Sequence, residues 1–299
     1  MPKPNFIFIG PSKTGSTWIF ELLRSHPAIY IPVAKDIYFF DKYFDKGVKW
    51  YEKQFKGGAN RQIAGELSHD YFSSKIAIDR IRMLYPSIKL ICCLRNPFDR
   101  AVSSYKYFQR NGLALGDFAV EIRNHPEIFE EGLYYKHLSY ILSNFDYKNV
   151  LVLYFDDLKS NSDEFARRIF NFIEVDGAFK SPVIGKQVNE SGSARSLFVA
   201  KIIKKIAVLV RNCGYPCVVG YLKRNNIILR ILYSKGGKKI VNNFSFPTYV
   251  VNAYNEEITQ LEHLLNVKLS HWRMNVQGSV IGQQTSDNHN TKTETTLIV

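Results

Sequence analysis

The stretch FIFIGPSKTGSTW, residues 6–18, places a short apolar run directly before a small loop that contains glycine. Four consecutive apolar residues suit a strand that is covered on both faces of a parallel sheet. The loop almost matches the phosphate-binding pattern G-x-x-x-x-G-K-[ST], but Ser16 stands in the lysine position and a lysine occurs earlier, at Lys13. A strand that runs through such a loop into a helix directs backbone N–H groups to one point. We therefore predict an anion site here, with an ordinary strand-to-helix turn as the alternative.

Further apolar runs at residues 88–94 and 150–155 predict two more strands, and helical patterns alternate with them. The expected helices cover residues 17–25, 76–85, 98–110, 133–145, 162–173 and 253–266. This alternation predicts a doubly wound α/β fold, in which a P-loop-like central parallel sheet is flanked by helices and followed by an irregular, basic helical C-terminal region. Such sheets bind ligands beyond the carboxyl ends of their strands, where the opening loop lies.

The 299-residue chain is basic, with 40 Lys and Arg, 27 Asp and Glu, and a formal net charge of +13. No acidic residue occurs between Ser191 and Asn255, a segment with eleven Lys and Arg. Residues 196–240 alternate Ile, Val and Leu with Lys and Arg, as an amphipathic helix at an anionic membrane surface does. A basic face that guides an acidic glycan is the alternative. No nucleic-acid-binding motif accompanies the charge, so we expect no nucleic acid partner.

The start of the chain and its hydropathy predict a location. No signal peptide is expected, because the first predicted strand begins a few residues after Met1, and no apolar run reaches the length of a membrane span. We therefore expect a cytoplasmic protein, with peripheral contact to the inner face of the membrane as an option. Residues 277–299 are rich in Gln, Ser, Asn and Thr, which predicts a disordered tail.

A second motif, LRNPFDRAVSSY, spans residues 94–105 at the end of the second predicted strand. Pro97 suits the first turn of a helix, and Arg95 and Ser103 could converge on one phosphate. The alternative is an ion pair between Arg95 and a structural carboxylate. A magnesium-dependent kinase needs a lysine after the second glycine and an aspartate at this strand end. Ser16 and Arg95 stand there instead, so we predict a site without metal and disfavour a P-loop kinase.

Together, PSKTGSTW and LRNPFDRAVSSY resemble the 5′-phosphosulfate loop and the 3′-phosphate motif of sulfotransferases that use 3′-phosphoadenylyl sulfate. Other segments in residues 5–273 resemble landmarks of the glycan (heparan-type) and bacterial branch of that family: IYIPVAKDIYFFD, GELSHDYF, GLYYKHLSYIL, LYFDDL, VNESGSARS and LEHLLNVKLSHW. The resemblance implies a sulfotransferase fold and transfer of a sulfuryl group to a hydroxyl or amine of a carbohydrate or glycolipid. It also implies a domain at 1–276, a nucleotide-binding core at 5–185, a donor-closing and acceptor-side region at 186–276, and a tail at 277–299.

The resemblance also implies a donor site formed by the first loop, the second motif and a late loop that closes over the donor. Its expected residues are Ser12, Lys13, Thr14, Gly15, Ser16, Thr17, Arg95, Ser103, Ser193 and Arg195. Lys13 and the N–H groups of the loop are expected to neutralise the bridging oxygen as adenosine 3′,5′-bisphosphate departs. For the segment around Arg195, a flexible basic linker is the alternative.

Removal of the acceptor's proton requires a base opposite the donor. The family's glutamate before its His-Phe-Phe-Asp stretch corresponds to Asp36 in DIYFFD, residues 36–41, and Tyr38 replaces the histidine. GELSHD, residues 65–70, lacks the lysine of the family's GEKSP. Asp36 is therefore the expected base. The alternatives are His69 as the base, or Asp36 as a solvated carboxylate beside Lys35.

The residues expected to contact the acceptor are Asp36, Asp41, His69 and Asp70. The departures from the family pattern concern the acceptor side and leave the donor motifs intact. They keep open a membrane-bound scaffold that binds the nucleotide without turnover.

Overall fold

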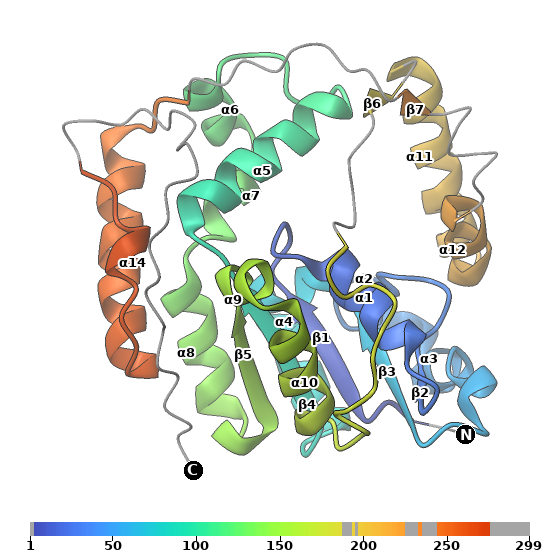
Figure 1. The fold of residues 1–299 in the computed structure, drawn as a ribbon. Coiled ribbons are helices and arrows are strands. Elements are labelled where there is room, and N and C mark those ends of the chain that lie inside the picture. Colours follow the sequence, from blue (N-terminus) through green and yellow to red (C-terminus); the bar gives the residue numbers. More distant parts are fainter. Residues whose placement is uncertain (1–2, 187–192, 195–196, 225–232, 235–243, 276–299) are drawn as a thin grey trace. The chain divides into compact units, whose positions relative to one another are not determined.

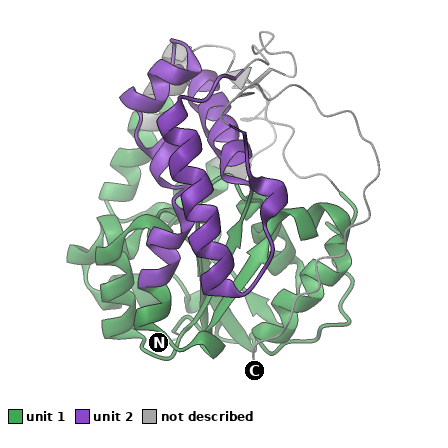
Figure 2. Cartoon of the chain, turned by 90° about the vertical axis from the view of Figure 1, so that its left-hand side faces the viewer, with its two compact units in different colours: residues 1–95, 141–237 green, residues 96–140, 238–299 purple. Residues whose placement is uncertain are grey.

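The computed structural model describes residues 3–186, 193–194, 197–224, 233–234 and 244–275. The chain divides into two compact units, and each unit combines an early and a late segment (Figure 2). The first unit comprises residues 1–95 and 141–237, and the second comprises residues 96–140 and 238–299. The boundary expected near residue 185 remains a prediction, and the tail at 277–299 lies outside the described residues.

A parallel five-stranded sheet in the order β2–β3–β1–β4–β5 forms the centre of the first unit (Figure 1). The strands are β1 Phe6–Gly10, β2 Ile29–Tyr30, β3 Ile63–Leu67, β4 Lys89–Leu94 and β5 Val150–Tyr154. In the middle strand, Phe6 lies opposite Gly65 on one side and Lys89 on the other. Every residue of β1 is buried, as its continuous apolar run predicts.

Helices accompany the sheet in the first unit. They are α1 Ser16–Ser25, α2 Phe39–Lys42, α3 Val48–Lys53, α4 Lys75–Leu84, α9 Phe155–Ser160, α10 Ser162–Phe172, α11 Leu197–Asn212 and α12 Pro216–Arg224. Helices α1 and α10 share one apolar cluster with β1, in which the rings of Trp18 and Phe165 meet edge to face at 5.8 Å. A short antiparallel pair joins β6 Ser193–Ala194 to β7 Tyr233–Ser234. None of the described helices combines the length and the apolar composition that crossing a bilayer requires.

The second unit is helical. It contains α5 Pro97–Arg110, α6 Phe118–Asn124, α7 Glu127–Glu130, the start of α8 Tyr134–Asn144, and α14 Thr248–Leu265. Pro97 is the first residue of α5, as expected, and the Asn96 side chain caps the helix by accepting a hydrogen bond from the N–H of Phe98 (3.0 Å). The core is aromatic, because Phe98 packs edge to face on Phe246 and Tyr254 at 5.1 Å in each case.

Five 3₁₀ turns complete the described chain: η1 Phe44–Lys46, η2 Lys56–Gly58, η3 His69–Ser73, η4 Tyr147–Asn149 and η5 Ser270–Trp272. The structure confirms the predicted α/β fold with a parallel central sheet. It adds β2 and β3, neither of which the sequence analysis predicted; β3 was missed because Gly65 and Glu66 interrupt its apolar pattern. Gly65 is required there, since a Cβ would lie 2.2 Å from the ring of Phe6 on β1.

Candidate active site

The loop between β1 and α1 contains three residues with positive φ: Gly10 (118°), Lys13 (67°) and Gly15 (90°). Only glycine fits at Gly10, because a Cβ there would lie 2.1 Å from the carbonyl oxygen of His69. Thr14 Oγ1 donates a hydrogen bond to the carbonyl oxygen of Pro11 (2.8 Å) and closes the loop. The loop therefore passes directly against the backbone of His69 before it turns into α1.

The start of α1 is open to an anion. Gly15 occupies the N-cap position, no side chain of the described residues caps the helix, and its first turn contains no acidic residue. The first N–H groups of a helix have no partner within the helix, and the helix dipole makes this end positive. The loop thus has the hydrogen-bonding and electrostatic properties of a phosphate or sulfate site.

Arg95 lies beside this loop, directly after the end of β4. Its Nη1 donates to the carbonyl oxygen of Lys13 (3.3 Å), and its guanidinium lies 4.8 Å from the ring centroid of Phe155. This contact places a permanent cation at the loop, and a guanidinium binds phosphate rather than a metal ion. Within the described part of the chain, no cluster of three His, Cys, Asp or Glu side chains could hold a metal ion.

Lys35 is a second cation at the loop, and the sequence analysis assigned it no function. Its ammonium donates to Ser16 Oγ (3.0 Å) and to Thr17 Oγ1 (3.2 Å), the hydroxyls of the first two residues of α1. The side chain is half-buried. Burial lowers the pKa of Lys35, against the opposing attraction of Asp36 and Glu21.

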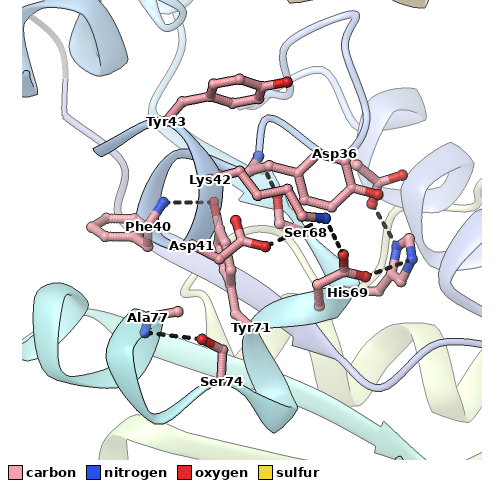
Figure 3. A network of polar contacts seen from close by, with 12 residues as sticks. Asp36, Phe40, Asp41, Lys42, Tyr43, Ser68, His69, Tyr71, Ser74 and Ala77 are labelled. Carbon is pink, nitrogen blue, oxygen red and sulfur yellow. Dashed lines mark hydrogen bonds and ion pairs between the residues drawn. The ribbon is translucent and has the colours of Figure 1, made fainter. Parts of the chain in front are cut away.

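Asp36, His69 and Asp70 form a chain of polar contacts next to the loop, and Figure 3 shows the part of it between Asp36 and His69. His69 Nδ1 lies 2.6 Å from Asp36 Oδ1, and His69 Nε2 lies 3.0 Å from Asp70 Oδ1. The backbone N–H of Asp36 donates to the carbonyl oxygen of Leu67 at the end of β3 (2.8 Å), which positions the carboxylate. Asp36 is only 8% exposed, so its interpretation as a solvated carboxylate is wrong.

The contacts of His69 favour its charged form. Burial lowers the pKa of His69, but the charges of Asp36 and Asp70 and the hydrogen bond to Asp36 outweigh burial, and the net pKa is raised. An ionised carboxylate only accepts hydrogen bonds, so His69 Nδ1 is the donor to an ionised Asp36, and a protonated His69 also forms an ion pair with Asp70 through Nε2. The position of His69 between two carboxylates thus stabilises a positive charge on its imidazole.

Tyr38 and Lys42 lie over the same network. Lys42 Nζ is 2.5 Å from Asp70 Oδ2 and 3.5 Å from Asp41 Oδ2, and it lies 3.7 Å from the ring centroid of Tyr38. Burial raises the pKa of Asp41 to about 6, although Lys42 acts against this shift. Asp36 and Tyr38 have φ values of 65° and 59°, a strained conformation for residues with a Cβ that clusters at functional sites.

Glu66, to which the sequence analysis assigned no role, positions the segment of Tyr38 and Phe40 indirectly, through hydroxyl groups that bond to both. Ser68 Oγ (2.6 Å) and Tyr71 Oη (2.7 Å) donate to its carboxylate, and so does Tyr51 Oη. The Ser68 hydroxyl also accepts a hydrogen bond from the backbone N–H of Tyr38, and the Tyr71 hydroxyl accepts one from the backbone N–H of Phe40, each at 3.3 Å. Burial raises the pKa of Glu66 to about 7, against these hydrogen bonds. Its place in β3 in front of two hydroxyl-bearing residues is the only sequence signal for this role.

The structure brings most of the expected site residues together within the first unit. Ser12, Lys13, Thr14, Gly15, Ser16 and Thr17 form the loop and the start of α1, and Asp36, Asp41, His69 and Asp70 form the adjoining network. The Thr14 side chain is fully buried, so its backbone N–H is the group left for a ligand. Ser103 lies on α5 of the second unit, and its convergence with Arg95 remains a prediction. Ser193 belongs to β6, and Arg195 lies outside the described residues.

Several curated proteins are similar to part of this chain. Human heparan sulfate glucosamine 3-O-sulfotransferase 5 is 31% identical over 156 residues, which cover 48% of this chain and 45% of the human protein. Membrane-associated sulfotransferase kil1 of Dictyostelium discoideum is 34% identical over 131 residues, which cover 42% of this chain and 28% of that protein. The chain thus spans less than half the length of these relatives.

The predicted cytoplasmic location is wrong. It relied on the first residues of the chain, and the relatives are heparan sulfate sulfotransferases and a protein named as membrane-associated. These proteins are much longer than the matched segment, so the residues before the first strand carry no information on location.

The fold and the family agree with the motifs. A sulfotransferase crystal structure from Alicyclobacillus acidocaldarius superposes with a TM-score of 0.63 at 21% sequence identity, over 92% of this chain and 100% of that one. The family model described as the sulfotransferase domain matches residues 3–189, which include both predicted phosphate motifs and the Asp36–His69 pair. The chain belongs to the sulfotransferase family.

Proposed function

We propose that this protein transfers a sulfuryl group from 3′-phosphoadenylyl sulfate to a hydroxyl of a carbohydrate, either free or carried by a lipid. One observation supports this proposal above the others. The Gly10 turn of the anion loop lies against the backbone of His69, whose side chain bonds to Asp36. The first unit thus places a cationic loop, which suits the leaving phosphate, next to the Asp36 carboxylate, which suits the acceptor's proton. The names of the heparan sulfate relatives support a carbohydrate acceptor.

On the donor side, the N–H groups at the start of α1 and Lys13 would bind the 5′-phosphate. Arg95 belongs to the expected 3′-phosphate motif, and Ser103, Ser193 and Arg195 remain proposed contacts. In the reaction, the acceptor oxygen forms a bond to sulfur while the bond from sulfur to the 5′-phosphate oxygen breaks. Negative charge grows on the departing phosphate, and fixed positive charges stabilise it without a metal ion.

On the acceptor side, we assign Asp36 as the base that takes the proton of the attacking hydroxyl. His69 is a positioning residue, because its imidazolium orients the Asp36 carboxylate and is itself held by Asp70. The two carboxylates raise the pKa of His69 and so favour its protonated form, which cannot accept a proton, and on this ground we rank Asp36 above His69 as the base. Asp36, Asp41, His69 and Asp70 together would face the acceptor.

Two alternatives predict different behaviour. A P-loop kinase would need magnesium and the residues that Ser16 and Arg95 replace. A scaffold without turnover would bind the nucleotide but release no product. Against the scaffold, Asp36 is buried and held by His69 beside the loop, an arrangement suited to proton transfer.

A transfer assay tests the proposal. The protein is incubated with donor labelled with ³⁵S in its sulfuryl group, in the presence of EDTA, with desulfated heparan polysaccharide or a neutral glycolipid extract as acceptor. We expect the label to appear in a carbohydrate product and EDTA to have no effect. Binding of the donor without label transfer to any carbohydrate would support the scaffold and contradict the proposal.

We also propose that helices α11 and α12 contact an anionic membrane. They and the turn between them carry exposed large apolar side chains: Ile203, Ile206, Val208, Leu209, Tyr215, Val218, Tyr221 and Leu222. The segment around them contains only basic charged residues, which complements anionic lipid headgroups. Gly220 of α12 packs against Val33, since a Cβ would lie 2.5 Å from the Val33 carbonyl oxygen, so this surface adjoins the segment that leads to Asp36.

Vesicle flotation checks the membrane contact. We expect the protein to float with vesicles that contain phosphatidylserine but not with pure phosphatidylcholine, and the double variant Leu209→Glu, Tyr221→Glu to remain at the bottom. Ile76→Glu is the matched control, because Ile76 is 61% exposed on α4 and its replacement should leave flotation unchanged. Absence of flotation with the phosphatidylserine vesicles would refute the membrane contact and favour an acidic glycan as the partner of this surface.

A further inference from the structure

Lys35 occupies an electrostatically unusual position. Ammonium groups are normally favoured at the C-terminal end of a helix, where the dipole is negative. The ammonium of Lys35 instead lies at the N-terminal end of α1, bonded to the hydroxyls of Ser16 and Thr17. These hydroxyls are neutral, so their hydrogen bonds do not compensate the positive charge.

Burial adds to this cost. The side chain of Lys35 is half-buried, and desolvation lowers the pKa of Lys35 even though Asp36 and Glu21 favour its charged form. Arg95 contributes another positive charge to the same loop through its contact with the Lys13 carbonyl oxygen. A helix end, a lysine and an arginine thus add positive potential at one place, which an anion would relieve.

We infer that Lys35 binds the 5′-phosphosulfate end of the donor and, as the residue before Asp36, links the donor loop to the acceptor base. The inference rests on the proposed function and deepens it by adding a residue to the site. During transfer, the ammonium would remain protonated and bind an oxygen of the 5′-phosphate while sulfur passes from the bridging phosphate oxygen to the acceptor oxygen. The acceptor's proton goes to the Asp36 carboxylate, so Lys35 neither gains nor loses a proton.

A purely structural role makes a different prediction. In that case Lys35 would only tie the segment before Asp36 to α1 through the hydroxyls of Ser16 and Thr17. A polar, uncharged side chain would then preserve much of its effect. If Lys35 binds an anion, its charge is what matters, and the loss should appear only with ligands that carry a 5′-anion.

Calorimetric titration separates the two roles. Wild type, Lys35→Met and Lys35→Gln are titrated with adenosine 3′,5′-bisphosphate and with adenosine 3′-monophosphate, which lacks the 5′-phosphate. Because both variants lose a hydrogen bond from a charged group to the 5′-phosphate, we expect them to bind the bisphosphate about 10- to 100-fold more weakly. Their affinity for the monophosphate should stay within about two-fold of the wild type. The control for the loss of one positive charge is Lys49→Met, which replaces an exposed lysine on α3 and should behave as the wild type.

Each outcome bears on a separate claim. Wild-type affinity of Lys35→Gln for the bisphosphate, or an equal loss for both ligands, would overturn the anion-binding role of Lys35. If the wild-type protein itself fails to bind the bisphosphate, the proposed function fails. Thermal unfolding without ligand identifies a variant that does not fold, and in that case the more conservative Lys35→Gln provides the decisive comparison.

Discussion

Replacing Asp36 with asparagine is expected to lower kcat for sulfuryl transfer by about 10²–10⁴-fold, the range in which a positioned general base contributes. Asparagine has the same shape and its amide oxygen can still accept from His69 Nδ1, so the geometry of the network should persist. The affinity for adenosine 3′,5′-bisphosphate should therefore stay close to that of the wild type. Steady-state transfer of labelled sulfate measures kcat, and calorimetry measures the affinity.

Two further results sharpen the Asp36→Asn test. The pKa of His69, followed by NMR titration of the imidazole, should fall in the variant because Asp36 supplies part of the raised value. Asp45→Asn, an exposed carboxylate on η1, is the matched control and should leave kcat unchanged. If Asp36→Asn keeps wild-type kcat, Asp36 is not the base, and the His69 alternative is the one to pursue with His69→Gln.

The raised pKa of His69 also has a consequence for folding stability. Because the folded pKa lies above that of the unfolded chain, about 6.5, protonation favours the folded state. The stabilisation is fully present below the unfolded pKa and is lost as pH rises through the folded pKa. The Asp36→Asn variant should therefore show a weaker dependence of its unfolding free energy on pH across that window.

The second large effect is expected at Lys13. Lys13→Met should lower kcat by about 10²–10³-fold, the usual loss when one group that stabilises developing negative charge is removed. Methionine keeps the unbranched shape of the side chain, one atom shorter, but removes its charge. Since the charge on the 5′-phosphate grows during transfer, kcat should fall more than the affinity for the donor, 3′-phosphoadenylyl sulfate, does. Single-turnover kinetics separates the two quantities.

The Lys13 result has its own control. Lys49→Met removes an equal charge on α3, and we expect it to have wild-type kinetics. Methionine is also strained at φ 67°, so the thermal stability of Lys13→Met should be measured alongside. A fall in affinity that accounts for the whole loss of transfer would contradict the assignment of Lys13 to the developing charge.

Local patterns were sufficient to predict the loop after β1 and the place of Arg95 at the end of β4. The apolar run of β1 is continuous because both faces of the strand are covered, and the glycine loop follows it directly along the chain. The same reasoning placed Arg95 at the end of β4, where it reaches the Lys13 carbonyl oxygen. These features depend on residues near one another in sequence and on the general rule that parallel strands end at the same edge.

The polar network around Asp36 depends on long-range pairing, and its contacts could not be predicted from local patterns. Asp36 and His69 were candidates singly, but their contact follows from β3, which brings the Ser68 N–H to the Phe8 carbonyl oxygen (3.0 Å). Glu66 made this strand hard to recognise, because a carboxylate in an apolar run argues against a buried strand. Its burial is tolerated because hydroxyl groups donate to it, and one of them belongs to Tyr51, which is 15 residues away in the sequence. Lys35 was missed for a similar reason, since its partners lie on α1.

The central claim is that the loop after β1 binds the 3′-phosphoadenylyl sulfate nucleotide without metal, and calorimetric titration of the intact protein tests it most directly. Adenosine 3′,5′-bisphosphate and ATP are each titrated in EDTA and again in excess magnesium. We predict saturable one-to-one binding of the bisphosphate that is the same in both buffers and much tighter than that of ATP. Binding of ATP that requires magnesium, with no binding of the bisphosphate, would contradict the account.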